Sequence, residues 1–171
     1  SDAAKNSGGI MGRLINGTIT IDNCLFSGKI NVGGKLRTSN TGGFIGNIAA
    51  GTVTVKHTLN SGEIVVTESE KVNAIGRVFG QVADSEDITI IMENSYFTRK
   101  GYSEAYWYYC AGKKPTIIGG VELKEEKDIL GYSGYRTTGL DFSKYWSVVV
   151  KEDGTPILKS FAKKSPSVAG L

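Results

Sequence analysis

The segment Gly8-Gly9-Ile10-Met11-Gly12 recurs 34 positions later as Gly42-Gly43-Phe44-Ile45-Gly46. The residues that follow keep this spacing, since Gly17-Thr18-Ile19-Thr20 returns as Gly51-Thr52-Val53-Thr54. A third, weaker copy contains Gly80, and three additional residues around Asp84 shift its later positions to a spacing of 37. A fixed period in this range indicates stacked supersecondary units, each too small to bury its apolar face alone. The repeat therefore decides the architecture.

Each copy has the residue pattern of short β-strands. Thr18-Ile19-Thr20-Ile21 and Thr52-Val53-Thr54-Val55 are β-branched throughout and alternate with a period of two, which is typical of strands with one buried face. Gly and Asn at the breaks favour turns, so we expect about three short strands in each copy. Equivalent strands run in the same direction and can stack as parallel neighbours about 4.8 Å apart. The sequence thus predicts an all-β fold, a right-handed parallel β-solenoid (β-helix) of about three coils, with an irregular α/β C-terminal cap.

Alignment of the copies predicts the interior as columns of apolar side chains. The columns are Ile10, Phe44 and Val78; Leu14, Ile48 and Val82; Ile19, Val53 and Ile90; Ile21, Val55 and Met92; Leu25, Leu59 and Tyr96; and Ile30 with Ile64. Gly12, Gly46 and Gly80 form a column without side chains, where we expect a bend or the close approach of a neighbouring wall.

One aligned slot after the second strand holds Asn23, His57 and Asn94. Side chains of this kind satisfy the backbone groups of turns, so the interpretation of His57 is a turn residue. Cys24 aligns with small residues in the other copies and is expected to fill a packing slot.

Composition narrows the classes of function. The chain has 171 residues, a net charge of +3, two cysteines and a single histidine. So weak a charge does not indicate a nucleic-acid partner, and no apolar run approaches the roughly 20 residues of a membrane span. Cys24 and Cys110 define no disulfide framework, and most zinc and triad chemistry lacks its residue types. We therefore expect no cofactor, no metal site and no membrane insertion of this segment.

The repeated residues resemble the GLUG motif. The resemblance rests on Gly8 to Gly12, Asn16 to Thr20 and Ser27-Gly28, with their equivalents in the second copy, and it covers residues 8 to about 98. Copy three departs from the pattern, because Arg77 stands where the second glycine of the motif belongs. GLUG repeats occur in large bacterial surface and secreted proteins, and in the non-catalytic region of immunoglobulin A1-cleaving metallopeptidases. The resemblance implies an extracellular location, at the cell surface or secreted, and no catalytic residues.

The remaining segments are expected to frame the repeats. Residues 1–7 are polar and resemble the start of a piece cut from a longer chain, residues 8–98 are the three coils, residues 99–161 form an aromatic-rich loop and cap, and residues 162–171 are a tail or linker. Within the cap, residues 121–131 favour a short helix or turn, and residues 146–150 with 156–161 predict a strand pair around Asp153-Gly154. We expect further domains of the same chain to flank this segment.

Five aromatic residues lie close together after the repeats. Aromatic faces at a surface bind sugar rings or protein partners, and the same residues can fold over the end of a solenoid as a cap. The sequence leaves both interpretations open for Tyr102, Tyr106, Trp107, Tyr108 and Tyr109.

Two functions compete at this level. The first is a non-enzymatic module that acts in adhesion, ligand display or spacing, with a host or cell-surface glycan or protein as partner. The second is a carbohydrate-active β-solenoid, because Asp84, Glu86 and Asp87 cluster in the lengthened turn of copy three. Two carboxylates at a suitable separation can cleave a glycosidic bond, although a solvated loop explains the same cluster.

Overall fold

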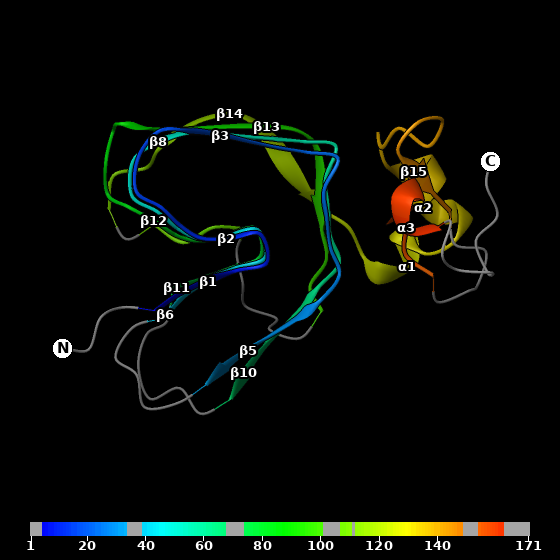
Figure 1. Ribbon diagram of the computed structural model, residues 1–171, viewed down its shortest axis with the longest axis horizontal. Coiled ribbons are helices and arrows are strands. Elements are labelled where there is room, and N and C mark those ends of the chain that lie inside the picture. Colours follow the sequence, from blue (N-terminus) through cyan, green and yellow to red (C-terminus); the bar gives the residue numbers. More distant parts are fainter. Residues whose placement is uncertain are drawn as a thin grey trace.

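Parallel strands dominate the structure, and equivalent strands of successive copies lie side by side. The computed structural model describes residues 5–33, 39–67, 74–100, 107–110, 112–148 and 154–162. Viewed along the stack, the copies follow nearly the same curled outline (Figure 1). The prediction of an all-β fold built on parallel sheets is confirmed.

Each copy contributes one strand to each of several sheets. The first sheet holds β1 (Lys5–Gly8), β6 (Ser39–Gly42) and β11 (Ala74–Gly76), and the second holds β2 (Met11–Leu14), β7 (Ile45–Ile48) and β12 (Phe79–Val82). The largest contains β3 (Thr18–Asp22), β8 (Gly51–Lys56), β13 (Ile88–Phe97) and β14 (Thr116–Leu123), together with β4 (Leu25–Phe26) and β9 (Leu59–Asn60). A two-stranded sheet pairs β5 (Lys29–Gly33) with β10 (Glu63–Thr67).

The first two copies contain more strands than the sequence predicts. Copy one folds into β1–β5 and copy two into β6–β10, where about three strands were expected in each. The additional breaks are very short, such as Gly9-Ile10 between β1 and β2 and Ser27-Gly28 between β4 and β5. Residues 5–7, expected ahead of the first coil, lie in β1 and pair with β6.

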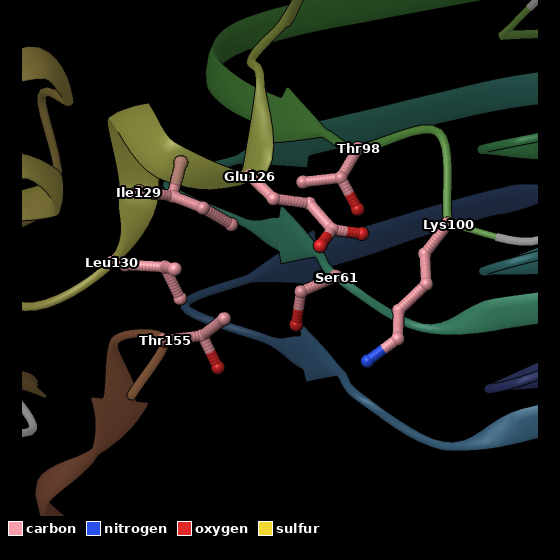
Figure 2. Close-up of a pocket in the computed structure, with 7 residues that line it drawn as sticks. All are labelled: Ser61, Thr98, Lys100, Glu126, Ile129, Leu130 and Thr155. Carbon is pink, nitrogen blue, oxygen red and sulfur yellow. The ribbon is translucent and has the colours of Figure 1, made fainter. Parts of the chain in front are cut away.

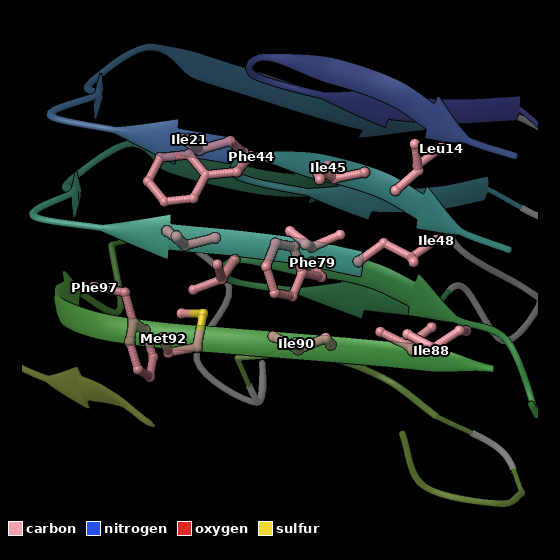
Figure 3. Packing of buried hydrophobic residues seen from close by; sticks show 14 of the residues in the cluster. Leu14, Ile21, Phe44, Ile45, Ile48, Phe79, Ile88, Ile90, Met92 and Phe97 are labelled. Atoms are coloured by element: carbon pink, nitrogen blue, oxygen red, sulfur yellow. The ribbon is translucent and has the colours of Figure 1, made fainter. Parts of the chain in front are cut away.

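The predicted register between copies is found in the hydrogen-bonded pairs. Leu14 pairs with Ile48, which pairs with Val82, and Ile21 pairs with Val55, which pairs with Met92. The inward side chains of such columns form much of the main apolar core, which Figure 3 shows as rows stacked one above another. Stacking in register lets each apolar side chain cover its equivalent, so burial repeats with the sequence period.

The column of Leu25, Leu59 and Tyr96 differs from its predicted place. These residues pair in register, but Leu59 and Tyr96 belong to a second cluster with Trp146, while the neighbouring Phe26 and Phe97 face the main core. Successive residues of a strand point to opposite faces, and here both faces are covered. The main core therefore holds members of the other four three-residue columns, although the prediction is wrong for Ile10, which is 45% exposed. Ile64 lies in a third cluster with Val32 and Ile75.

The glycine column marks a close approach of two walls, as predicted. A β-carbon on Gly46 would lie 2.6 Å from the backbone of Ser7 and 2.6 Å from the carbonyl of Gly12, and one on Gly80 would lie 2.6 Å from the nitrogen of Thr41. The strands of the first sheet thus pack against those of the second at backbone distance, which only glycine permits.

The aligned slot of Asn23, His57 and Asn94 is a turn position in every copy. All three residues have positive φ, at 49°, 50° and 43°. Asn enters this left-handed region more easily than most residues, because its short polar side chain bonds locally. The backbone turns here from the long strand of each copy into the next wall.

The C-terminal residues take two separate positions. Residues 107–110 and 112–123 add a further row to the end of the stack, since Tyr109 pairs with Gln81 and β14 pairs with β13. The rest lies beside the wall that β13 forms (Figure 1). It comprises α1 (Glu126–Ile129), α2 (Tyr132–Thr137), α3 (Lys159–Ala162) and an antiparallel pair of β15 (Trp146–Ser147) and β16 (Ile157–Leu158). The predicted strand pair is therefore present, but its second strand is shorter than predicted, because residues 159–161 belong to α3.

Candidate functional site

The aromatic run is partly built into the stack. The amides of Val78 and Phe79 both donate to the carbonyl of Trp107, at 2.9 Å, and the amide of Val82 donates to Tyr109. Trp107 therefore stands one row beyond Ile10, Phe44 and Val78. Its ring meets Phe79 edge-on at 6.1 Å, and Trp107 and Tyr108 pack against the main core.

Trp107, Tyr108 and Tyr109 are therefore partly buried residues at the end of the stack. Burial, and secondarily the nearby Cys110, raises the pKa of the Tyr108 hydroxyl. Tyr102 and Tyr106 lie outside the described residues, so the structure does not bring the five predicted residues together or separate them. A role of the run in ligand binding stays a prediction.

The acidic cluster in the lengthened turn contacts the segment that follows the aromatic run. The carboxylate of Asp84 accepts a hydrogen bond from the backbone amide of Lys113, and the ammonium of Lys113 lies 3.0 Å from Glu86. Both side chains of the Lys113–Glu86 ion pair are exposed. Two of the three acids thus fasten residues 112–116 to copy three.

The slot of Asn23, His57 and Asn94 has polar contacts with neighbouring residues and, at Asn23, with Trp146 of the C-terminal segment. The His57 Nδ1 lies 3.0 Å from the carboxylate of Asp22, and the Cys24 thiol donates to the Asp22 carbonyl. Burial, more than the nearby Asp22 charge, raises the pKa of Cys24, which favours the neutral thiol. Within the described ranges, no three histidine, cysteine or carboxylate side chains gather as metal ligands.

A cavity of about 240 Å³ lies between the stack and the C-terminal segment. It is lined by Ser61, Thr98, Lys100, Glu126, Ile129, Leu130 and Thr155 (Figure 2). The stack supplies Ser61, Thr98 and Lys100, whereas α1 and the residues near it supply the opposite wall. The stack, α1 and the residues just before β16 therefore create this space together.

Two of the lining residues, Ser61 and Thr98, have buried hydroxyl groups. Ser61 follows β9 and Thr98 follows β13, and since Leu59 pairs with Tyr96 they occupy the same position of successive copies. Ser61 is 8% exposed and Thr98 1% exposed. Neither hydroxyl has a hydrogen-bond partner among the residues that the structure describes. The same holds for the buried hydroxyls of Thr41 and Thr58, so this feature is not specific to the cavity.

Charged and apolar groups complete the lining. Figure 2 shows the side chains of Glu126 and Lys100 among those that line the cavity, and both residues are exposed. Ile129, which is fully buried, and Leu130 provide an aliphatic surface on the α1 side. The stack thus supplies a polar wall, whereas the C-terminal segment supplies both polar and aliphatic residues.

Only part of this cavity has a signal in the amino-acid sequence. Ser61 belongs to the repeated Ser-Gly pair, but that pair was interpreted as part of the repeat and not as a site. Thr98 occupies the same slot in copy three, after the insertion shifts the spacing to 37. The opposite wall has no periodic signal, because α1 reaches the cavity only through tertiary packing.

Comparison with known proteins identifies no relative of this chain: no model of a protein family, no curated protein and no solved structure matches it. The resemblance to the GLUG motif therefore stays a prediction. No helix in the described part of the chain has the length and apolar character needed to cross a membrane.

Proposed function

We propose that the chain is a non-enzymatic repeat module of a bacterial cell-surface or secreted protein, folded as a right-handed β-solenoid. Its role is adhesion, ligand display or spacing, with a cell-surface or host glycan or protein as partner. The observation that supports this best is the constant register of 34 residues, which relates copy two to copy one in every sheet they share. Such an array is a rigid rod with a repeated outer surface.

Handedness and location have separate support. Equivalent strands are parallel and belong to one sheet, and crossover connections of this kind are right-handed in about 98% of cases. The extracellular location rests on the resemblance of Gly8 to Gly12 and its repeats to the GLUG motif. Flanking domains of the same chain fit the same proposal.

The alternative is a carbohydrate-active enzyme that uses the acids near Asp84–Asp87. Its weakness is that Asp84 and Glu86 both contact Lys113, and a catalytic carboxylate must instead reach the substrate. The test is release of reducing ends from a panel of soluble polysaccharides by the purified chain. We expect none above the level of the Asp87→Ala variant. Turnover that disappears in this variant would overturn the non-enzymatic proposal.

A further inference from the structure

We propose that the two ends of the stack bind each other, so that a second copy of this chain adds its first row to the last row of the first copy. The first row is copy one, and the last row consists of residues 107–110 and 112–123. In the part of the chain that the structure describes, β3 pairs with β8 alone and β14 pairs with β13 alone. Each end therefore has a strand edge to which another strand can add.

Exposed apolar side chains of the stack lie at these two ends. Among the described residues of the stack, the large hydrophobic side chains that are exposed are Ile10 and Ile15 in the first row and Ile118 in the last row. Phe44 and Val78 hold the position of Ile10 in the next two rows, yet they are 1% and 0% exposed, whereas Ile10 is 45% exposed. The exposure of Ile10 thus follows from its place in a row that no further row covers.

Backbone hydrogen bonds run from row to row in one direction beside this column. In each row, two successive amides donate to one carbonyl of the next row. The donors are Ile10 and Met11, Phe44 and Ile45, and Val78 and Phe79, and the acceptors are Phe44, Val78 and Trp107. This pattern leaves the Ile10 carbonyl at one end and the amides of Trp107 and Tyr108 at the other, without partners among the described residues. They are the acceptor and the donors of one more step of the same kind.

The backbone of β3 has its free groups at alternate residues. Thr52 donates to the Gly17 carbonyl, and the Asn23 amide donates to Lys56, so the groups of Gly17 and Asn23 face copy two. Successive residues of a paired strand direct these groups to opposite sides, so the groups of Thr18 and Thr20 point away from the stack.

The backbone of β14 is in the matching phase. His57 donates to the Glu93 carbonyl, so Glu93 faces copy two and the groups of Ile90, three residues earlier, face β14. Ile117 lies opposite Ile90, and in a parallel pair its own groups then point outward. Pairing Ile117 between Thr18 and Thr20 of a second copy continues both the hydrogen bonds and the apolar column, because Ile19 of that copy then lies beside Ile117.

The shape of the stack favours translation of the second copy over a two-fold contact. Successive rows follow nearly the same outline, and the C-terminal segment lies beside this outline and not over it (Figure 1). A translated copy can therefore continue both walls of the last row. A two-fold rotation reverses the strands, and because the outline has no such symmetry it can align only one wall. The contact is thus heterologous, and it permits an open series of copies.

The experiment is sedimentation velocity of the 171-residue chain over a range of concentrations. The variants are Thr20→Pro and Ile117→Pro, each of which removes one outward amide and leaves the bonds within the stack in place, as proline does at a strand edge. The matched controls are Thr20→Val and Ile117→Val, which keep the amide. Circular dichroism checks that each variant folds.

We expect the mass of the parent chain to rise with concentration past that of a dimer, and the valine variants to behave in the same way. Each proline variant alone should keep the mass of one chain, because one of its two ends is blocked. An equimolar mixture of the two proline variants should form a dimer and nothing larger, since each contributes the end that the other lacks.

Three results would overturn the inference. A parent chain that stays monomeric at every concentration shows that the ends do not bind each other. Dimers of one proline variant alone indicate a two-fold contact between identical ends. Association that neither proline changes places the contact on another surface, such as the exposed Phe161.

Hydrogen exchange of the parent chain decides the matter if a proline variant does not fold. The amides of Thr18 and Thr20 should exchange more slowly as the concentration rises, whereas the amide of Thr54 in copy two should not change. Equal exchange of Thr18 and Thr20 at all concentrations would also overturn the inference. The inference goes beyond the proposed function and does not depend on it, because two copies can stack whether or not the module cleaves or binds a glycan.

Discussion

The backbone of Gly46 lies so close to Ser7 that a β-carbon added to Gly46 would be 2.6 Å from the Ser7 nitrogen. This contact joins two walls of the stack, because Gly46 is in β7 and Ser7 is in β1. The same approach recurs one row further on, between Gly80 and Thr41. Backbone atoms cannot move aside as a flexible side chain can, so the contact fixes the spacing of the walls.

Gly46→Ala should destabilise the fold by about 3 kcal/mol or more, because the added methyl group forces two packed walls apart. Urea unfolding followed by circular dichroism measures the loss. Gly120→Ala is the matched control, since a β-carbon there meets nothing within 4 Å. Equal stability of the two variants would show that the walls separate easily.

Val53→Asp should abolish cooperative folding, because Val53 is fully buried in the main core and the new charge would have no partner there. Thr54→Asp, one residue along β8 and on the opposite face, should change the free energy of unfolding by less than about 1 kcal/mol. Thermal unfolding of both variants is the measurement. A similar loss in the two would contradict the assignment of faces.

Trp146→Ala should detach the C-terminal segment from the side of the stack. Trp146 is fully buried against Leu59 and Tyr96, and its Nε1 donates to the Asn23 side chain at 3.3 Å. Loss of so large a buried ring costs about 3–5 kcal/mol, which here falls on the docking of the segment.

Hydrogen exchange can locate the effect of Trp146→Ala. Amides of α1, α2 and β15 should exchange faster, while those of β7 and β8 in the main core should keep their protection. Tyr132→Ala is the control, because Tyr132 is 54% exposed. Uniform loss of protection over the whole chain would mean that the segment and the stack unfold together.

Asp141 should make the C-terminal segment sensitive to acid. A hydrogen bond from the Ser143 hydroxyl, at 2.5 Å, is the main cause that lowers the pKa of the Asp141 carboxyl, and the Lys144 amide adds to it. A folded-state pKa below the unfolded value stabilises the protein above the unfolded pKa, and this contribution is lost as pH falls through the folded pKa.

The difference in stability between the parent chain and Asp141→Asn should therefore shrink as the pH falls below about 4, the ordinary pKa of an aspartate. Ser143→Ala should raise the pKa of Asp141 toward that value, which NMR titration of the carboxyl carbon measures. A pKa that Ser143→Ala leaves unchanged would assign the shift to another cause.

The repeat let the sequence alone determine the class of fold, the parallel pairing and the register. A residue such as Val55 lies between Ile21 and Met92 because the spacing of the copies places it there. In a stack, residues one repeat apart in the sequence are neighbours in space, so the pairing can be predicted from the repeat spacing alone. The glycine column and the turn slot of His57 follow from the same regularity.

Only the tertiary structure decided what covers the outer face. Leu59 alternates with Asn60 in a strand whose two residues are both buried, so periodicity could not show which of them faces the main core. The answer depends on Trp146, which is 87 positions beyond Leu59 and belongs to no repeat. The cavity at Ser61 and Thr98 has the same origin, because these two residues repeat with the sequence and the opposite wall does not. Periodic contacts are local in a stack and can be predicted from spacing, whereas the docking of a single non-repeated segment depends on the shape and chemistry of two surfaces that exist only after folding.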